Sequence, residues 1–400
     1  MKHNLHGELD IRDLELNALL EITQAINNNL SEGDLYRIYR FTLLGDLKVK
    51  RMAMFVQANG WECKVHFGTA GDIQNHPLPS DYESMEASEI VGHPHPFDQF
   101  DFVFPVRHKE KLLAVVFVGG MPETETVDST FLRALTNILM VAIENKKLAR
   151  QQLEQEAYRK EMEIAKKVQN FLFPKSLPNT PRLWIEAVYL PHQDVGGDYY
   201  DYIPLTESKF LLCIADVSGK GVPAALLMSN FQASLRTLVR KTHDLKEIIH
   251  ELNHATYISS NAENFITVFI GIYDFETAGL EYANCGHNPS VLFHDNKMTI
   301  LEEGTTVLGM FDPLPFIETC LLTDLDDFFF FGYTDGLTET FNASGDQFGF
   351  DALIAILETY RNGGMDNLFS FIFGALEDFR SELTYADDIT MICCQVKNEP

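Results

Sequence analysis

The chain has 400 residues, about twice the usual size of one domain, so two or three domains are expected. Its 31 Lys and Arg residues against 58 Asp and Glu residues give a net charge of −27, and so negative a surface repels nucleic-acid phosphates and anionic lipid. Nucleic acid and membranes are therefore poor candidate partners. No apolar run reaches the roughly 18 residues that a membrane span needs, and the first residues lack the pattern of a signal peptide, so we expect a cytoplasmic protein. None of the six cysteines forms a C-x-x-C pair, which indicates neither a zinc site nor a disulfide framework.

Residues 1–143 have the pattern of one α+β domain. Apolar residues at helical spacing predict a helix over 11–30, and a second helix is expected over 34–47. Two strand pairs follow, and the first is joined through Asn59-Gly60, a dipeptide favoured in tight hairpin turns. The four strands are predicted at 52–56, 63–67, 102–106 and 112–118. A long polar loop over 70–98 and an apolar helix over 131–143 complete an antiparallel sheet with one face closed by helices.

Residues 144–174 are predicted to form a helical, coiled-coil-like linker. Half of the 24 residues from Glu144 to Lys167 are charged, and none is Gly or Pro. Two apolar seams compete along this helix, one interrupted by Gln155. The first seam contains Val141, Leu148 and Met162, and the second contains Leu153, Ala157, Ile164 and Val168. The segment is either a solvated spacer or a helix that joins two copies of the chain and carries a signal.

Residues 175–400 group strands and helices in the manner of a second α+β domain with mostly antiparallel sheets. Strands are predicted at 183–190, 199–205, 209–215, 265–273, 279–284, 327–333 and 389–396. Helices are predicted at 222–241, 245–260, 351–360 and 365–379.

Four places in this second domain put a carboxylate at the end of an apolar strand or beside glycine. A single such Asp is usually a turn residue or a helix cap, but four together point to a shared site. Hard divalent cations take oxygen ligands, and strand ends bring distant residues together on a rigid frame. The four places are Gly196-Gly197-Asp198-Tyr199-Tyr200-Asp201, Asp216 after the run 210–215, Thr334-Asp335-Gly336 after the run 328–333, and Asp387-Asp388.

The motif that follows Asp216 joins a strand to a helix. It runs Val217-Ser218-Gly219-Lys220-Gly221-Val222-Pro223, with Pro in the first helical turn, where a missing N–H costs nothing. The free N–H groups of that turn could help to hold an anionic substrate. The alternative is that Ser218 only caps the helix and the glycines only form the turn. The spacing is not that of a phosphate-cradling P-loop.

In this order and spacing, six motifs over roughly 160–397 resemble the SpoIIE-type bacterial branch of the metal-dependent PPM serine/threonine phosphatases. The motifs are Ala165-x-x-x-Gln169-x-x-Leu172-x-Pro174, Val195-Gly196-Gly197-Asp198-Tyr199-Tyr200-Asp201, Ala215-Asp216-Val217-Ser218-Gly219-Lys220-Gly221, Asn284-Cys285-Gly286-His287-Asn288-Pro289, Tyr333-Thr334-Asp335-Gly336 and Asp387-Asp388-Ile389-Thr390. The resemblance implies a four-layer αββα fold, with two packed antiparallel sheets and a two-metal site at one end of them. It also implies hydrolysis of phosphoserine or phosphothreonine on a partner protein.

Carried over residue by residue, the resemblance assigns the two Mn²⁺ or Mg²⁺ ions to four catalytic carboxylates. Asp198 and Asp216 would be shared by or flank both metals, and the main-chain carbonyl of Val217 would add a ligand. Asp335 and Asp387 would complete the second metal. Supporting roles fall to Asp388, Gly197 and Ser218. His287 could be a general acid, although a His between Gly and Asn is more often a loop-shaping residue.

Residues 1–143 resemble a GAF sensory domain in the order of their elements. Together these features predict a homodimeric phosphatase under the control of a small-molecule or protein signal, and the resemblance implies a phosphorylated STAS-domain anti-sigma-factor antagonist as substrate. A pseudo-phosphatase scaffold in such a partner-switching pathway is the alternative. A nucleotide cyclase is discounted, because Tyr199-Tyr200 follows Gly196-Gly197-Asp198 where that motif needs an acidic-aromatic pair.

Overall fold

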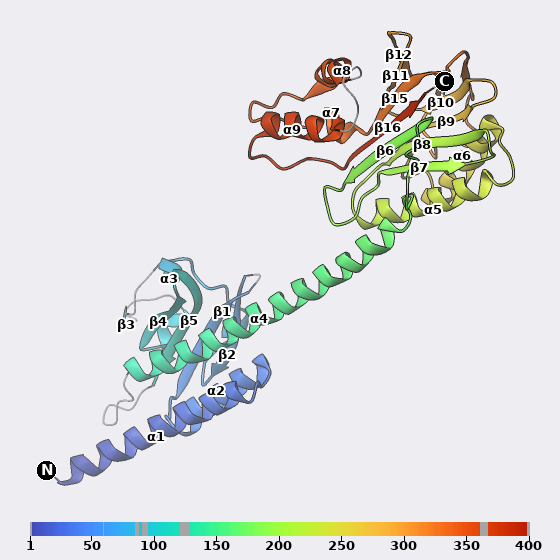
Figure 1. The fold of residues 1–400 in the computed structure, drawn as a ribbon. Helices are drawn as coiled ribbons and strands as arrows, with labels where there is room; N and C mark the ends of the chain where they lie inside the picture. The colour runs from blue at the N-terminus through green and yellow to red at the C-terminus, as the bar shows by residue number, and fades with distance from the viewer. Residues whose placement is uncertain are drawn as a thin grey trace. The chain divides into compact units, whose positions relative to one another are not determined.

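The computed structural model describes residues 2–58, 60–84, 88–89, 95–120, 129–360 and 367–397, and the chain divides into two compact units, residues 1–157 and 158–400. Figure 1 shows the elements of both units. No helix in these described ranges is both long and apolar enough to cross a membrane.

The first unit is built on a five-stranded antiparallel sheet of order β2-β1-β5-β4-β3. Its strands are β1 (Arg51–Gln57), β2 (Trp61–Phe67), β3 (Ser88–Glu89), β4 (Phe102–His108) and β5 (Lys111–Gly119). Its helices are α1 (Lys2–Asn27), α2 (Glu32–Gly45), α3 (Asp81–Ser84) and the first part of α4 (Ser129–Asn170), with short 3-10 turns at Ile73–Asn75 and Phe97–Gln99. The four predicted strands are confirmed, whereas Asn59 of the predicted turn lies outside the described residues.

Strand β5 shows why this sheet is central to the first unit. Val116 and Val118 pack in the core formed with α1, α2 and α4, whereas Val115 and Phe117 pack on the opposite face in a core that includes Tyr82 and Phe97. A strand buried on both faces has a continuous apolar sequence instead of an alternating one. Full burial of a side chain such as Phe117 contributes about 1.5–3 kcal/mol. The assignment of this unit as GAF-like stays a prediction.

Helix α4 is one continuous helix of 42 residues. The sequence predicted a core helix followed by a linker helix, and the absence of Gly and Pro between them explains why they fuse. Its first turns bury Leu132, Leu135 and Leu139. Farther along, side chains of both predicted seams are exposed in the single chain, among them Leu148 and Leu153. The dimer therefore stays a prediction.

The second unit has four layers, as predicted. One sheet has the order β13-β10-β9-β8-β7 with β14 paired to β10, and the other has the order β12-β11-β15-β16-β6. The strands are β6 (Leu183–Leu190), β7 (Tyr199–Pro204), β8 (Lys209–Val217), β9 (Ile266–Asp274), β10 (Gly279–Cys285), β11 (Ser290–His294), β12 (Lys297–Leu301), β13 (Gly304–Thr305), β14 (Cys320–Leu322), β15 (Phe328–Tyr333) and β16 (Ile389–Val396). The helices are α5 (Val222–Leu238), α6 (Leu245–Ser260), α7 (Asp335–Thr338), α8 (Gly349–Tyr360) and α9 (Leu368–Arg380).

Three apolar cores separate these layers. Phe269 and Phe330 meet between the two sheets, with their ring centroids 5.0 Å apart. Met228 and Ile249 bury the faces of α5 and α6 against the first sheet, and a third core packs α8 and α9 on the second sheet. Figure 1 shows the two helix pairs on opposite sides of the packed sheets.

The sequence prediction missed short elements of this unit. The β11-β12 hairpin turns at Asp295-Asn296, both at positive φ (47° and 61°), which is the pattern of a two-residue hairpin turn. Helix α7 is a single turn and was also missed. The helix predicted from residue 365 begins at Leu368, and residues 361–366 lie outside the described ranges.

Candidate active site

The predicted carboxylates lie at one end of the two packed sheets. Asp198 immediately precedes β7, and Asp216 is the penultimate residue of β8, where β7 pairs Tyr199 with Ala215. Asp335 follows β15, and Asp387 precedes β16, where these two strands pair Tyr333 with Met391. Burial, together with the nearby charges of Asp335 and Asp387, raises the pKa of Asp216 to about 7. The fold thus brings together carboxylates that are far apart in sequence.

Asp198 links the two sheets. Its side chain is 1% exposed, and its Oδ2 accepts hydrogen bonds from the hydroxyls of Thr334 (2.8 Å) and Thr390 (2.6 Å). Thr334 Oγ1 in turn accepts a bond from the Thr390 N–H at 2.9 Å. Burial raises the pKa of Asp198, with Asp216 and Asp388 adding to the rise while the two hydroxyls oppose it. Both threonines stand inside motifs of the sequence, but their local pattern alone does not indicate a role for them.

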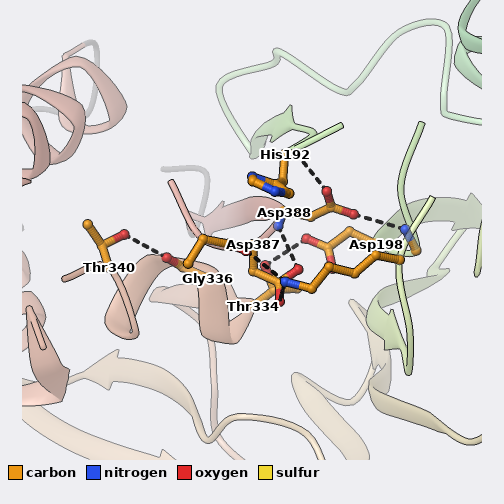
Figure 2. Close-up of polar contacts among 10 residues, drawn as sticks. His192, Asp198, Thr334, Gly336, Thr340, Asp387 and Asp388 are labelled. Atoms are coloured by element: carbon orange, nitrogen blue, oxygen red, sulfur yellow. Dashed lines mark hydrogen bonds and ion pairs between the residues drawn. The ribbon is translucent and has the colours of Figure 1, made fainter. Parts of the chain in front are cut away.

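Asp388 holds the loop that leads to Asp198. Its Oδ1 accepts the His192 N–H at 2.7 Å and its Oδ2 accepts the Gly197 N–H at 2.9 Å, as Figure 2 shows. A Cβ added to Gly196 would lie 1.8 Å from Asp388 Oδ2, so only glycine fits there. Burial raises the pKa of Asp388, and these backbone donors oppose the rise. Contacts of this kind suit the supporting role that the sequence analysis gave to this residue.

Asp387 and Asp335 lie nearer to solvent. Asp387 Oδ2 pairs with Lys220 Nζ at 2.6 Å, and the same Nζ donates to the Ala386 carbonyl at 2.7 Å. Burial raises the pKa of Asp335, Asp387 and Glu339 raise it further, and Lys220 opposes the rise. Lys220 thus provides positive charge at this edge of the carboxylate cluster.

Val217 and Ser218 continue β8 into the loop before α5. A Cβ added to Gly197 would lie 2.8 Å from the Val217 carbonyl oxygen, so this carbonyl faces the glycine loop beside Asp198. Ser218 Oγ accepts the Phe265 N–H at 2.9 Å, and the N-cap of α5 is Gly221. The alternative in which Ser218 caps the helix is therefore wrong, because its hydroxyl ties the β8 end to the start of β9.

Asp201 has a different role from Asp198, although both stand in one motif. The Asp201 carboxylate forms two bonds of 2.8 Å with Arg236 of α5 and accepts the hydroxyl of Tyr199. Such a bidentate pair fixes α5 on the sheet. Asp201 is therefore a structural carboxylate of the first sheet.

His287 is a buried residue of the loop between β10 and β11. Its Nδ1 is 2.9 Å from Thr267 Oγ1, its backbone N–H donates to Asn284 Oδ1 at 2.7 Å, and burial lowers its pKa to about 4. Among the described residues, its Nε2 has no hydrogen-bonding partner. A neutral, enclosed imidazole of this kind suits the loop-shaping role better than that of a general acid.

Gln169, near the end of α4, forms hydrogen bonds with the glycine loop that precedes Asp198. Its Nε2 donates to the Gly196 carbonyl at 2.7 Å, and its Oε1 accepts the Gly196 N–H at 3.4 Å. Gln169 stands inside a motif of the sequence, but its local pattern alone does not indicate this contact. The last turns of α4 are thus connected by hydrogen bonds to the residues that precede Asp198.

The donors present suit hard divalent cations. Within the described ranges, no three His, Cys, Asp or Glu side chains converge into a ready-made metal cage. The chemistry of the cluster nevertheless fits, because burial and repulsion between neighbouring carboxylates raise the pKa values of Asp198, Asp216 and Asp335. Cations with oxygen preference, such as Mg²⁺ and Mn²⁺, would relieve that repulsion.

The second unit is similar to the SpoIIE-type branch of the PPM phosphatases. Residues 206–397 match the family model described as "Stage II sporulation protein E (SpoIIE)". Asp198 and Gln169 precede the matched residues.

Two curated relatives are phosphoserine phosphatases of Bacillus subtilis (strain 168). The chain is 31% identical to "Phosphoserine phosphatase RsbU" over 193 residues, 48% of this chain and 57% of the relative. It is 26% identical to "Phosphoserine phosphatase RsbP" over 187 residues, 45% of this chain and 46% of the relative. The chain therefore spans about half the length of these curated relatives.

A solved structure supports the fold. The "SiaA-PP2C domain of Pseudomonas aeruginosa" superposes with a TM-score of 0.55 at 19% identity, over 61% of this chain and 99% of that domain. At this identity the likeness establishes the four-layer architecture alone.

Proposed function

We propose that the chain is a metal-dependent protein phosphatase that hydrolyses phosphoserine or phosphothreonine on a partner protein. The observation that carries this proposal is the carboxylate cluster at the shared end of the two sheets, in which burial and neighbouring carboxylates raise the pKa of Asp216 to about 7. The family match and the phosphoserine phosphatase relatives support it.

Asp198, Asp216, Asp335 and Asp387 are the residues that would hold two Mn²⁺ or Mg²⁺ ions, together with the Val217 carbonyl. Bound ions would supply a nucleophile from water near neutral pH and neutralise charge on the phosphoryl group. Thr334 and Thr390 hold the Asp198 carboxylate in one orientation, which is the preorganisation that a metal site requires.

The substrate we propose is a folded, phosphorylated STAS-domain protein, an anti-sigma-factor antagonist. With no deep-pocket motif in the sequence, specificity should come from docking of a folded partner, so short phosphopeptides should be poor substrates. Equal catalytic efficiency on a phosphorylated STAS-domain protein and on a peptide cut from it would contradict this.

Control is proposed to come from residues 1–143 as a GAF-like sensor of a small-molecule or protein signal, through a dimer joined by this unit and by the 144–174 helical linker. Gln169 supports this proposal, because it connects the end of α4 to Gly196. A signal that changes the packing of α4 would then reach the loop before Asp198.

The decisive experiment measures phosphate release from a phosphorylated STAS-domain protein with Mn²⁺ and with excess chelator. We expect turnover only with metal, and losses of orders of magnitude in Asp216→Asn and Asp335→Asn. Both variants should still fold, because each removes a like charge from an acidic cluster. Asp295→Asn is the matched control, since Asp295 is an exposed turn carboxylate of the same unit.

Undiminished turnover in chelator, or full activity in both site variants, would overturn the assignment. The alternative, a pseudo-phosphatase scaffold, predicts tight binding of the phosphorylated protein with no release of phosphate at saturating Mn²⁺. Such a scaffold has no reason to keep a costly buried cluster of like charges.

A further inference from the structure

An exposed apolar surface lies beside the carboxylate end of the second unit. It consists of Met310 and Phe311 in the loop after Leu308, and of Ile258 in α6, with exposed fractions of 40%, 53% and 66%. We refer to these three side chains as the 310 patch. Exposed apolar side chains that gather on one surface mark interaction sites, whereas single scattered ones need no explanation.

The strand register places this loop at the catalytic edge. Strands β8 and β9 pair Val217 with Ile266, and Ile266 forms an antiparallel bridge with Leu308. From Leu308 the chain therefore runs in the same direction as β8, past the sheet end at which Asp216 lies. Asn264 lies between this loop and the loop that follows β8. A Cβ added to Gly309 would be 3.2 Å from the Asn264 carbonyl oxygen, and a Cβ added to Gly219 would be 3.8 Å from Asn264 Oδ1.

Side chains of α6 fix the conformation of this loop. Asn253 is buried, and its side chain accepts the Gly309 N–H at 2.9 Å and donates to the Phe311 carbonyl at 2.8 Å. His254 Nδ1 lies 2.7 Å from Asp312 Oδ2, and Ile258 stands one helical turn beyond His254 on the same face. The backbone on both sides of Met310 is thus fixed, so a partner would meet a preorganised surface at low entropic cost.

Resting on the proposed function, we infer that the 310 patch is the docking surface for the folded phosphoprotein substrate, through apolar side chains that flank its phosphoserine. A phosphoserine on a folded surface can reach the carboxylate end only if the surrounding protein covers the adjacent loop. Electrostatics do not favour the encounter, since the chain carries a net charge of −27 and the phosphate is an anion. Lys220 is engaged by Asp387. Apolar contact at the patch is then the available source of affinity.

The test compares Phe311→Ser with Leu321→Ser in the full chain. Leu321 is the matched control, because it is 63% exposed in the same unit but pairs at the opposite end of β10, opposite Glu281. In chelator, binding of a fluorescently labelled phosphorylated STAS-domain protein should weaken about tenfold in Phe311→Ser, which is about 1.4 kcal/mol, and change less than about twofold in Leu321→Ser. With Mn²⁺, kcat/KM for that protein should fall by the same factor, while hydrolysis of p-nitrophenyl phosphate stays unchanged.

Several results would overturn the docking inference. The first two are an unchanged Kd in Phe311→Ser and no binding of the partner by the wild-type chain. The third is an equal loss of kcat/KM on the protein and on p-nitrophenyl phosphate. The fourth is a change in sedimentation in Phe311→Ser, which would mark the patch as a contact between copies of the chain. Failure of the proposed function is recognised separately: the wild-type chain would then hydrolyse neither substrate, while the Kd comparison still decides whether the patch binds the partner.

Discussion

The link between Gln169 and Gly196 can be broken by one substitution, Gln169→Leu. The side chain is 5% exposed and makes bonds of 2.7 and 3.4 Å to the two backbone groups of Gly196. Leucine has a similar volume but leaves those groups without a partner. An unsatisfied buried group costs about 1–3 kcal/mol, and the 3.4 Å bond is weak, so we expect the second unit to lose about 2 kcal/mol of stability.

Activity should fall as well. Gly196 fits against Asp388 with no room for a Cβ, and it is two residues from Asp198. A displaced Gly196 therefore moves both carboxylates, and a misplacement of about 1 Å at a catalytic centre can cost about a hundredfold in rate. We expect kcat on p-nitrophenyl phosphate to fall at least tenfold.

The assay uses the two tryptophans of the chain. Trp61 lies in the first unit and Trp184 in the second, so a Trp61→Phe background leaves one fluorescent reporter of the second unit during urea unfolding. Gln152→Leu is the matched control, an exposed glutamine on the same helix that should change stability by less than about 0.5 kcal/mol. A Gln169→Leu chain with unchanged stability would refute the energetic reasoning, and one with lower stability but unchanged kcat would refute the coupling to the site.

Three further predictions concern other parts of the chain. Gly336→Ala puts a Cβ 2.0 Å from the Asp388 carbonyl oxygen and should lower the free energy of unfolding by about 3 kcal/mol or more. Gly374→Ala meets no atom within 4 Å and should stabilise α9 by about 0.5–1 kcal/mol in urea unfolding. Similar results for both variants would count against the steric argument. Because burial lowers the pKa of His287 to about 4 from 6.5, the unfolded chain binds its proton first, so stability should fall by up to about 3 kcal/mol as the pH drops from about 6.5 to 4. His287→Gln should flatten that slope in urea titrations at several pH values, and parallel slopes would exclude the effect. Gln155→Leu should favour one seam of α4 and alter turnover, although Gln155 is not a residue of the site. The dimeric control model would be refuted if the full chain sediments as a monomer at micromolar concentration and Gln155→Leu leaves metal-saturated turnover unchanged.

The sequence predicted the layers of the second unit well, because its strands have strong local signals. The run 328–333 is apolar throughout, and β15 is buried on both faces between a sheet and helices. The short β11-β12 hairpin was missed, since two five-residue strands give little periodicity and the Asp295-Asn296 turn was overlooked.

The carboxylates of the candidate site were identifiable from sequence, but their partners were not. Thr390 and Asp198 are 192 residues apart, and only the packing of two different sheets brings them together. Gln169 and Gly196 are separated by an entire strand of the second sheet. Local pattern cannot separate Asp198 from Asp201 either, because Arg236, which makes Asp201 structural, is contributed by a helix later in the chain.

The polar contacts of the site converge on residues 196–198. Gln169 binds Gly196, Asp388 binds the Gly197 N–H, and Thr390 binds the Asp198 carboxylate, so two distant segments, the end of α4 and residues 388–390, fix three successive residues. A rotation of α4 that broke the 2.7 Å bond of Gln169 would cost about 1–3 kcal/mol. Allosteric coupling energies are of the same size and correspond to changes of roughly 5–150-fold. Under the proposed control by the first unit, the loss of this one buried hydrogen bond would therefore be large enough to change activity measurably, and small enough for the binding energy of a ligand to supply it.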